Sequence, residues 1–256
     1  MLKGCIADIE RAATHDGPGL RTTVFFKGCP LSCRWCHNPE CISFKPEIMA
    51  YPEKCIGCGK CNDGCFSGAR IICGKEMTSE EVLKEILLDK DYYGDNGGVT
   101  FSGGEPFAQP DFLEEIIDKC KNSNIKCAVE TSMIYFNDQI LKKLDLIMCD
   151  LKIWDSEEHK RYTGVGNEQI KENILKVDQL NIPVIVRTPV IPEINQGIEE
   201  ISEFLKPLKN VIQYELLPYH PLGEDKRRSL GLEETKFSVP TGEYMKELEK
   251  YVFIRK

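Results

Sequence analysis

The sequence predicts an α/β fold built on a parallel sheet, and three observations support this prediction. After residue 76, short apolar runs rich in β-branched residues alternate with helical patterns. Most of these runs do not alternate apolar with polar residues, as expected for a sheet covered on both faces. Strands that alternate with helices pair in parallel through right-handed crossovers. The sheet is therefore either open and doubly wound or a partial barrel, with its chemistry at the carboxyl ends of the strands.

Six segments are predicted to be strands. They are TTVFFKG (22–28), GVTFSG (98–103), IKCAVETS (125–132), DLIMCDLK (145–152), PVIVRTPV (183–190) and VIQYELLPY (211–219). The predicted helices are MTSEEVLKEILL (77–88), PDFLEEIIDKC (110–120), DQILKKL (138–144), a long polar-faced helix that contains Ile170, Ile174 and Val177, and GIEEISEFLKPL (197–208). Thr78 or Ser79 is expected to cap the helix at 77–88.

One segment interrupts this alternation. Residues 40–76 are rich in Cys, Gly and Pro and have little periodicity. We expect a main domain over residues 1–256 with an insert at 40–76 that folds around a metal.

Composition and charge exclude several classes of protein. The chain of 256 residues has 33 Lys and Arg against 41 Asp and Glu, a net charge of −8, so wrapping of nucleic acid is not expected. No segment approaches the roughly 20 apolar residues needed to cross a bilayer. The N-terminal sequence contains no continuous apolar run, so we expect a cytoplasmic protein without a membrane partner.

The 13 cysteines indicate metal binding more than a disulfide scaffold, because the chain is long, has no export signal and carries an odd number. Seven of them fall in two closely spaced groups. The first group is Cys29, Cys33 and Cys36, and the second is Cys55, Cys58, Cys61 and Cys65.

The first group directly follows the first predicted strand, so three thiolates project from one loop at the active end of the sheet. Three thiolates on a [4Fe–4S] cluster leave one iron open to a further ligand. Soft thiolates also suit zinc, and a structural zinc site would need a fourth ligand, for which His37 is the nearest candidate. The spacing alone leaves both alternatives open.

The spacing C-x3-C-x2-C after the first strand resembles that of the radical S-adenosylmethionine superfamily. Within it, THDGPGLRTTVFFKGCPLSCRWCHNPE, FSGGEP and CDLK resemble motifs of the activating enzymes of glycyl radical enzymes, over essentially the whole chain. The resemblance implies a partial (β/α)6 barrel. It also implies an open iron that chelates S-adenosylmethionine, reductive cleavage to a 5'-deoxyadenosyl radical, and abstraction of a hydrogen from a glycine of a partner enzyme.

The resemblance also implies roles for individual residues. Asp16, in the turn DGPG, is expected to lie beside the incoming glycine loop. Gly103 and Gly104 allow close approach of the backbone to a ligand, and the loop carbonyls with Glu105 are expected to receive the ammonium group of the cofactor. Asp150 and Lys152 are expected near its methionine end, although Asp-x-Lys is also compatible with a surface ion pair.

Further cofactor contacts are implied around the cavity. Arg187 and His220 end the fifth and sixth predicted strands, where an anionic ligand is expected; a carboxylate partner for the arginine and a structural role for the histidine are the alternatives. Trp35 and His37 are expected to pack on the adenine, with ordinary loop packing as the alternative. A monovalent cation is expected to be held by Glu130, Thr131, Asp150 and the backbone carbonyl of Met148.

The second group of cysteines has the spacing C-x2-C-x2-C-x3-C of bacterial ferredoxins, with Phe66 in place of the usual proline. We expect one auxiliary [4Fe–4S] cluster held by Cys55, Cys58 and Cys61. Its fourth ligand is Cys65, Cys41 or Cys73, because the fourth cysteine of a ferredoxin run ligates the other cluster. A zinc knuckle is the alternative. The remaining four cysteines are interpreted as small buried apolar residues: Cys5, Cys120, Cys127 and Cys149.

The leading functional hypothesis is a glycyl radical enzyme activase that acts as a monomer in an anaerobic setting, with flavodoxin or ferredoxin as reductant. Three alternatives compete with it. A radical S-adenosylmethionine enzyme for another peptide or a small molecule would leave no persistent radical on a partner. An iron–sulfur electron-transfer protein would not cleave the cofactor, and a zinc-bound interaction module would be colourless. The motifs do not identify which glycyl radical enzyme is served.

Overall fold

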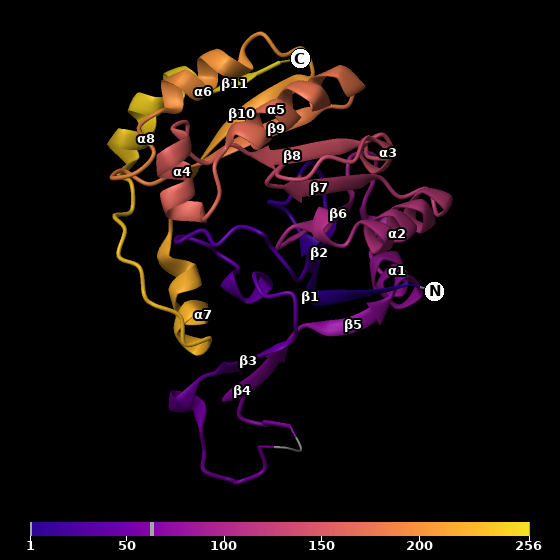
Figure 1. The fold of residues 1–256 in the computed structure, drawn as a ribbon. Coiled ribbons are helices and arrows are strands. Elements are labelled where there is room, and N and C mark those ends of the chain that lie inside the picture. The colour runs from indigo at the N-terminus through magenta and orange to yellow at the C-terminus, as the bar shows by residue number, and fades with distance from the viewer. Residues whose placement is uncertain (1, 62–63, 256) are drawn as a thin grey trace.

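The fold is described by a computed structural model that covers residues 2–61 and 64–255. A nine-stranded sheet has the strand order β11-β10-β9-β8-β7-β6-β2-β1-β5, and a two-stranded sheet pairs β3 with β4 (Figure 1). The strands are β1 Lys3–Ala13, β2 Arg21–Phe26, β3 Glu47–Ala50, β4 Arg70–Cys73, β5 Lys75–Thr78, β6 Gly98–Gly103, β7 Cys127–Thr131, β8 Leu146–Asp150, β9 Val184–Val190, β10 Val211–Pro218 and β11 Phe253–Ile254.

The six predicted strands are confirmed as six neighbouring parallel strands, β2, β6, β7, β8, β9 and β10. Antiparallel strands continue the sheet at both ends, where β1 and β5 follow β2 and β11 follows β10. In the part of the chain that the structure describes, the two ends do not pair with each other, so the sheet is open. The predicted partial (β/α)6 barrel is confirmed.

Three strands of the main sheet were missed by the sequence prediction. Strand β1 has mostly polar and half-exposed residues, while β5 and β11 are short. All three are antiparallel strands at the ends of the sheet. Strands of this kind are defined by their pairing more than by an apolar pattern, and polar residues are common there.

The helices are α1 Ser79–Leu87, α2 Pro110–Asn122, α3 Asp138–Leu141, α4 Ser156–Thr163, α5 Glu168–Val177, α6 Ile198–Leu205, α7 Glu224–Ser229 and α8 Gly242–Leu248. Four helices lie where they were predicted, α1, α2, α3 and α6, while α7 and α8 were not predicted. The expected long polar-faced helix is in fact two helices, α4 and α5. Gly164 ends α4 in the left-handed region at φ 88°, which only glycine adopts without strain. Thr78 caps α1 through a capping box with Glu81.

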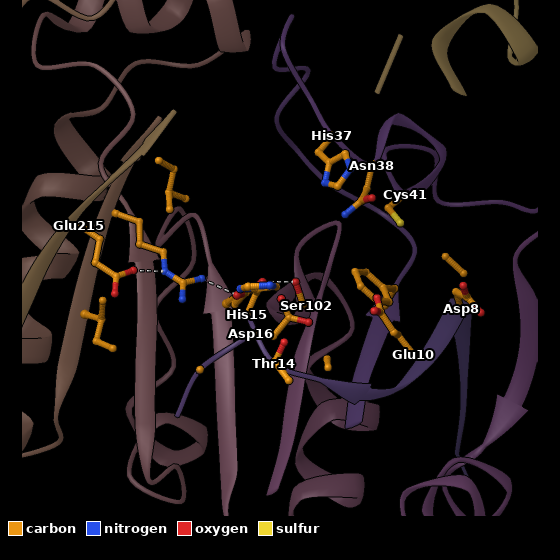
Figure 2. Close-up of a pocket in the computed structure, with 18 of the residues that line it drawn as sticks. Asp8, Glu10, Thr14, His15, Asp16, His37, Asn38, Cys41, Ser102 and Glu215 are labelled. Atoms are coloured by element: carbon orange, nitrogen blue, oxygen red, sulfur yellow. Dashed lines mark hydrogen bonds and ion pairs between the residues drawn. The ribbon is translucent and has the colours of Figure 1, made fainter. Parts of the chain in front are cut away.

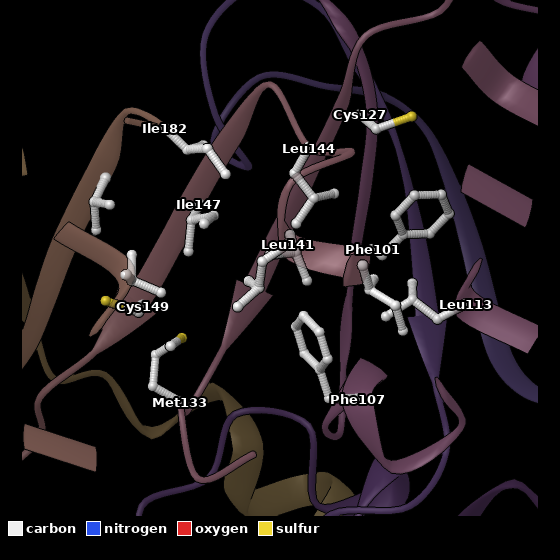
Figure 3. Close-up of a cluster of buried hydrophobic side chains, with 14 of the residues drawn as sticks. Phe101, Phe107, Leu113, Cys127, Met133, Leu141, Leu144, Ile147, Cys149 and Ile182 are labelled. Carbon is white, nitrogen blue, oxygen red and sulfur yellow. The ribbon is translucent and has the colours of Figure 1, made fainter. Parts of the chain in front are cut away.

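The hydrophobic core lies between the outer face of the sheet and helices α1, α2, α5 and α6 (Figure 3). Phe101 of β6, Ile147 of β8 and Val186 of β9 point into this core. Since side chains alternate along a strand, their neighbours point to the inner face, where Ser102 and Arg187 line a cavity. The apolar outer face therefore holds the sheet against the helices while the inner face is free for polar groups.

The segment at 40–76 contains the β3–β4 hairpin, which projects from the main sheet in Figure 1. Its last residues lie in β5, so the chain rejoins the main sheet at Lys75. Residue Lys27, which follows β2, has a fully buried side chain whose Nζ donates to the Glu40 carbonyl at 2.5 Å and pairs with Glu47 at 3.2 Å. This lysine ties the base of the hairpin to the barrel.

None of the helices in the described part of the chain is long and apolar enough to cross a membrane.

Candidate active site

Two adjoining cavities lie inside the barrel: the smaller at the carboxyl ends of the parallel strands, and the larger extending from there along the inner face of the sheet to β1. The smaller has a volume of about 310 Å³ and the larger about 1560 Å³. Six residues line both cavities: His37, Asn38, Ser102, Glu130, Arg187 and Leu217. The two cavities are therefore neighbouring parts of one opening in the barrel, and Figure 2 shows the larger one.

The three cysteines of the first group, Cys29, Cys33 and Cys36, all line the smaller cavity. Backbone hydrogen bonds hold their loop on two sides. Cys29 N donates to the Ile42 carbonyl at 2.9 Å, and Ser32 N donates to the Thr163 carbonyl at the end of α4 at 2.8 Å. The loop is thus fixed between the insert and a barrel helix.

Burial raises the pKa of the Cys29 and Cys33 thiols to about 12, and it also raises the pKa of the Cys36 thiol. Buried thiols of this kind stay protonated unless a metal takes the place of the proton. Three such thiols on one cavity wall fit the donor set of an iron–sulfur cluster. Within residues 2–61 and 64–255, no three His, Cys, Asp or Glu side chains converge closely enough to hold a single metal ion.

The glycine loop after β6 packs tightly on the cysteine loop. Gly103 has φ 97°, and a Cβ there would meet the backbone of Phe26 at 2.6 Å. A Cβ on Gly104 would lie 2.5 Å from the Gly28 carbonyl oxygen and 2.6 Å from that of Cys41. Both glycines line the smaller cavity, so their backbone is available to a ligand.

Glu105 is placed differently from the expectation. Its side chain is fully buried and does not line either cavity. The carboxylate accepts hydrogen bonds from the hydroxyls of Thr131 and Ser132 and from the backbone N–H groups of Ser132 and Phe107. In this structure it therefore joins the end of β6 to the end of β7 and has no direct access to a ligand.

Arg187 lies between two carboxylates at the ends of three strands. Its Nη1 donates to Glu130 at 2.6 Å and its Nε donates to Glu215 at 3.0 Å. A dashed line starts at the labelled Glu215 in Figure 2. The other oxygen of Glu130 accepts from the Ser102 hydroxyl at 2.5 Å. Burial raises the pKa of Glu130, and Arg187 opposes this effect.

These contacts use the oxygens that were expected to hold a monovalent cation. Both oxygens of Glu130 are engaged, and the Thr131 hydroxyl donates to Glu105. Asp150 pairs with Lys152 at 2.5 Å. In this structure, positive side chains balance both carboxylates, and the monovalent cation stays a prediction.

Asp150 and Lys152 both line the smaller cavity, as expected for residues at the end of β8. Burial alone would lower the pKa of Lys152, but Asp150 and the nearby Cys33 raise it above its ordinary value. A permanently charged lysine beside three thiols favours their ionised form.

Asp16 lines the larger cavity, on a loop fixed to the sheet. Its carboxylate accepts from the Thr23 hydroxyl at 2.6 Å, and its backbone carbonyl accepts from the Thr100 hydroxyl at 2.7 Å. The buried Arg21 donates to the Pro18 carbonyl of the same loop at 3.1 Å. The turn DGPG therefore presents Asp16 in a defined position.

The remaining predicted cofactor contacts, Trp35, His37, Thr131 and His220, also line the smaller cavity. The rings of His37 and His220 meet edge to face with centroids 4.7 Å apart. The ring centroids of Trp35 and Tyr162 lie 6.1 Å apart, so ordinary packing between loops accounts for part of the position of Trp35.

The second group of cysteines lies apart from both cavities. Cys55, Cys58 and Cys61 are exposed and Cys65 is half-buried, all in the loop between β3 and β4. The other two ligand candidates are buried at the base of the hairpin, where they line the larger cavity: Cys41 and Cys73.

Several site residues were missed from the sequence. Glu215 follows Gln213 at a spacing of two in β10, and this period would have placed both on one face of the strand. Ser132 ends the predicted strand at 125–132, and Asn38 lies inside the motif that contains the three cysteines, but nothing in their spacing indicates a role. Their places in the site come from contacts between distant segments.

Comparison with known proteins agrees with this geometry. Residues 23–205 match the radical SAM superfamily. The 4-hydroxyphenylacetate decarboxylase activating enzyme of Clostridioides difficile (strain CD196) is 39% identical in an alignment 275 positions long, gaps included, that covers 91% of this chain and 87% of the relative. The (2S)-3-sulfopropanediol dehydratase activating enzyme of Klebsiella oxytoca is 36% identical, with 90% and 86% covered. The trans-4-hydroxy-L-proline dehydratase activating enzyme of Clostridioides difficile is 34% identical, with 96% and 94% covered.

The fold is also similar to those of solved structures. A domain of pyruvate-formate lyase-activating enzyme from Bacteroides vulgatus ATCC 8482 aligns with a TM-score of 0.52 and 31% identity over 60% of this chain and 92% of that chain. SuiB from Streptococcus suis aligns with a TM-score of 0.60 and 14% identity over 88% of this chain and 43% of its own, which shows the fold alone.

The partial barrel with a three-cysteine loop at its active end defines a radical S-adenosylmethionine enzyme. Within this class the relatives are more specific, since they share a third or more of their residues with the chain over most of its length. The chain belongs to the family of activating enzymes of glycyl radical enzymes.

Proposed function

We propose that the two cavities of this activase bind different reactants. The smaller holds the cofactors, and the larger admits the glycine segment of the partner enzyme. The supporting observation is that six residues, including Ser102, Glu130 and Arg187, line both cavities. When bound, a [4Fe–4S] cluster with S-adenosylmethionine supplies the 5'-deoxyadenosyl radical that abstracts the glycine hydrogen. The protein has to hold the two reactants against each other and exclude water.

In this proposal Cys29, Cys33 and Cys36 hold the cluster. The backbone of Gly103 and Gly104 approaches the amino group of S-adenosylmethionine, and Lys152 balances its carboxylate. Glu105 acts as a positioning residue, because its hydrogen bonds fix Thr131 and Ser132 beside the cofactor. On the other side of the shared wall, Asp16 accepts a backbone N–H of the entering glycine segment.

The volume of the larger cavity favours a protein substrate over a small molecule. Small-molecule pockets are typically about 300–1,000 Å³, and the larger cavity exceeds this range at about 1560 Å³. The partner is proposed to be a decarboxylase or dehydratase of the glycyl radical class, as the names of the relatives suggest. Flavodoxin or ferredoxin is the proposed reductant of the monomeric activase.

The exposed cysteines are proposed to hold one auxiliary [4Fe–4S] cluster, with Cys65 as its fourth ligand. In the hairpin, Cys73 pairs with Glu47 at the base while Arg70 pairs with Ala50 at the far end. Three residues of strand, roughly 10 Å, thus separate Cys73 from the loop that contains the other three ligands. Cys41 is buried on the barrel side of the same base.

Iron analysis tests the auxiliary cluster. We expect about eight irons in each reconstituted chain and about four in Cys65→Ala, since each cluster contains four. Loss of iron in Cys73→Ala but not in Cys65→Ala would contradict the assignment of the ligand.

Product analysis tests the function itself. The anaerobically reconstituted protein, reduced with dithionite, is expected to form 5'-deoxyadenosine from S-adenosylmethionine, and Cys33→Ala is expected to form none. Purified 4-hydroxyphenylacetate decarboxylase, (2S)-3-sulfopropanediol dehydratase and trans-4-hydroxy-L-proline dehydratase are then tested as partners, with a glycyl radical signal in electron paramagnetic resonance as the readout. A chain loaded with iron that forms no 5'-deoxyadenosine, with or without these partners, would contradict the proposal.

A further inference from the structure

One wall of the larger cavity does not come from the barrel. The β3–β4 hairpin supplies Met49, Ile71, Ile72 and Cys73 to its lining. We propose that this hairpin is a docking element that presses the glycine-bearing segment of the partner enzyme against β10 and β11. This inference rests on the proposed function and names the part of the chain that the partner contacts outside the reacting glycine.

The strands that face the hairpin across the cavity come from the other end of the sheet. Gln213–Leu217 of β10, Val252 and Ile254 line the cavity as well, and β10 and β11 lie at the opposite end of the strand order from β1 and β5. In Figure 2, Glu215 of β10 and Asp8 of β1 lie on opposite sides of the cavity. A segment that enters between them contacts both ends of the open sheet.

Both rims of the cavity expose large apolar side chains. On the hairpin side, Ile71 is 44% exposed and Ile72 73% exposed. On the opposite side, Leu217 is 40%, Val252 36% and Ile254 73% exposed. Single exposed apolar residues are common, but a group that borders one cavity from two sides marks an interaction surface.

The hairpin is held in position at its base. Lys226 of α7 donates to Glu40 at 2.6 Å and to the Asn38 side chain at 2.9 Å, while Lys27 holds Glu40 and Glu47 from the barrel side. A Cβ on Gly74 would lie 2.4 Å from the Lys27 side chain, so the chain packs closely where it leaves the hairpin. A wall fixed in this way is preorganised for docking and loses little entropy on binding.

The charges inside the cavity fit the same occupant. Asp8, Glu10 and Glu249 line it, and none of them forms an ion pair with another described residue. Such walls repel an acidic segment and attract one with basic side chains. The occupant that fits is therefore an apolar and basic segment of the partner protein that surrounds its glycine.

The test uses the reconstituted full-length protein and the partner that becomes radicalised in the screen described above. Ile71→Ser/Ile72→Ser and, separately, Ile254→Ser are compared with the wild type. The glycyl radical yield is measured against the partner concentration and normalised to the 5'-deoxyadenosine that each variant forms without partner. We expect the half-saturating partner concentration to rise about tenfold for each variant, because each loses apolar contact with the docked segment.

Leu175→Ser is the matched control, because Leu175 is 43% exposed on α5 and lines neither cavity. The control is expected to keep the half-saturating concentration of the wild type. Unchanged values in both rim variants would overturn the docking inference while leaving the activase function intact. Absence of 5'-deoxyadenosine in the wild type would instead count against the function.

A wild type that radicalises none of the three partners is tested with a chimera. Residues 47–73 are replaced by the corresponding segment of the Clostridioides difficile relative that is 39% identical. We expect the chimera to form a glycyl radical on 4-hydroxyphenylacetate decarboxylase. A chimera that forms 5'-deoxyadenosine but no such radical overturns the inference that the hairpin docks the partner.

Discussion

Arg187 joins two carboxylates from different strands in the wall shared by the two cavities. Its contacts with Glu130 and Glu215 connect β7, β9 and β10 at the ends where the chemistry takes place. Removal of one member of a buried ion pair leaves the others uncompensated and costs about 3–5 kcal/mol. The arginine is therefore expected to stabilise the barrel as well as the site.

We predict that Arg187→Met lowers the free energy of unfolding by about 3 kcal/mol and abolishes most 5'-deoxyadenosine formation. Urea unfolding of the cluster-free protein measures the first effect and product analysis of the reconstituted protein the second. Arg187→Lys is the control, since it keeps the charge but not the forked geometry, and a smaller loss of stability is expected. Equal stability of wild type and Arg187→Met would refute the structural part of the prediction.

Asp89 joins the N-terminal strand to the barrel far from the site. Its carboxylate accepts from Arg11 at 2.5 Å and from the buried Thr22 at 2.8 Å. The hydrogen bond from Arg11 is the main reason that the pKa of Asp89 lies below its ordinary value. Because the pKa of Asp89 is lower in the folded state than in the unfolded state, its carboxylate stabilises the fold at any pH above the unfolded-state pKa. This stabilisation is lost as the pH falls through the folded-state pKa.

We predict that Asp89→Asn lowers the free energy of unfolding at pH 7 by about 1–3 kcal/mol. The difference from the wild type should shrink as the pH falls from about 5 to below about 3, because the wild-type carboxyl then becomes protonated. Urea unfolding at several pH values measures both. The exposed Asp91→Asn serves as the control and should unfold like the wild type at each pH. A difference for Asp89→Asn that stays constant with pH would argue against the Arg11 contact.

At the scale of elements, the loop after β6 and the cysteine loop after β2 form one unit. Gly104 lies between the carbonyl oxygens of Gly28 and Cys41, and a backbone atom cannot move aside as a flexible side chain can. A side chain at this position would separate the two loops. Cluster binding and cofactor binding are thus coupled through one close contact.

We predict that Gly104→Ala lowers the iron content by up to about four atoms in each chain and weakens binding of S-adenosylmethionine. Iron analysis and calorimetric titration of the anaerobic protein measure the two effects. Gly242→Ala is the control, because a Cβ there meets no other atom within 4 Å. Full iron content and unchanged affinity in Gly104→Ala would show that the loops can separate without cost.

At the scale of the whole molecule, the site is distributed along the chain. The smaller cavity takes residues from the first cysteine loop, from the ends of β6, β7, β8 and β9, and from the segment after β10. None of these groups is assembled in the unfolded chain. A ligand that binds all of them therefore binds only the folded state and stabilises it by mass action.

We predict that S-adenosylmethionine at about 100 times its Kd stabilises the reconstituted protein by about 2.7 kcal/mol. For a chain of this size the corresponding rise in Tm is roughly 5–10 °C, measured by anaerobic thermal scanning. Gly104→Ala should show a smaller rise at the same concentration. An unchanged Tm in the wild type would indicate that the ligand does not bind across the strands as described.

The sequence by itself determined the six parallel strands, the three-cysteine loop and the family. These features depend on residues that are close along the chain, such as the apolar runs of the strands and the spacing of Cys29, Cys33 and Cys36. Local spacing also predicted that Asp150 and Lys152 lie on one cavity wall, because they are two residues apart at the end of one strand.

Only the tertiary structure decided the features that depend on contacts between distant segments. Strands β1, β5 and β11 exist through pairing at the ends of the sheet, not through an apolar pattern. Glu105 turns inward because Thr131 and Ser132 of the next strand offer it hydrogen bonds, and Glu130 pairs with Arg187 two strands away. The hairpin reaches the larger cavity because Lys27 and Lys226 hold its base against the barrel. Long-range contacts of this kind have no periodicity or spacing in the sequence from which they could be inferred.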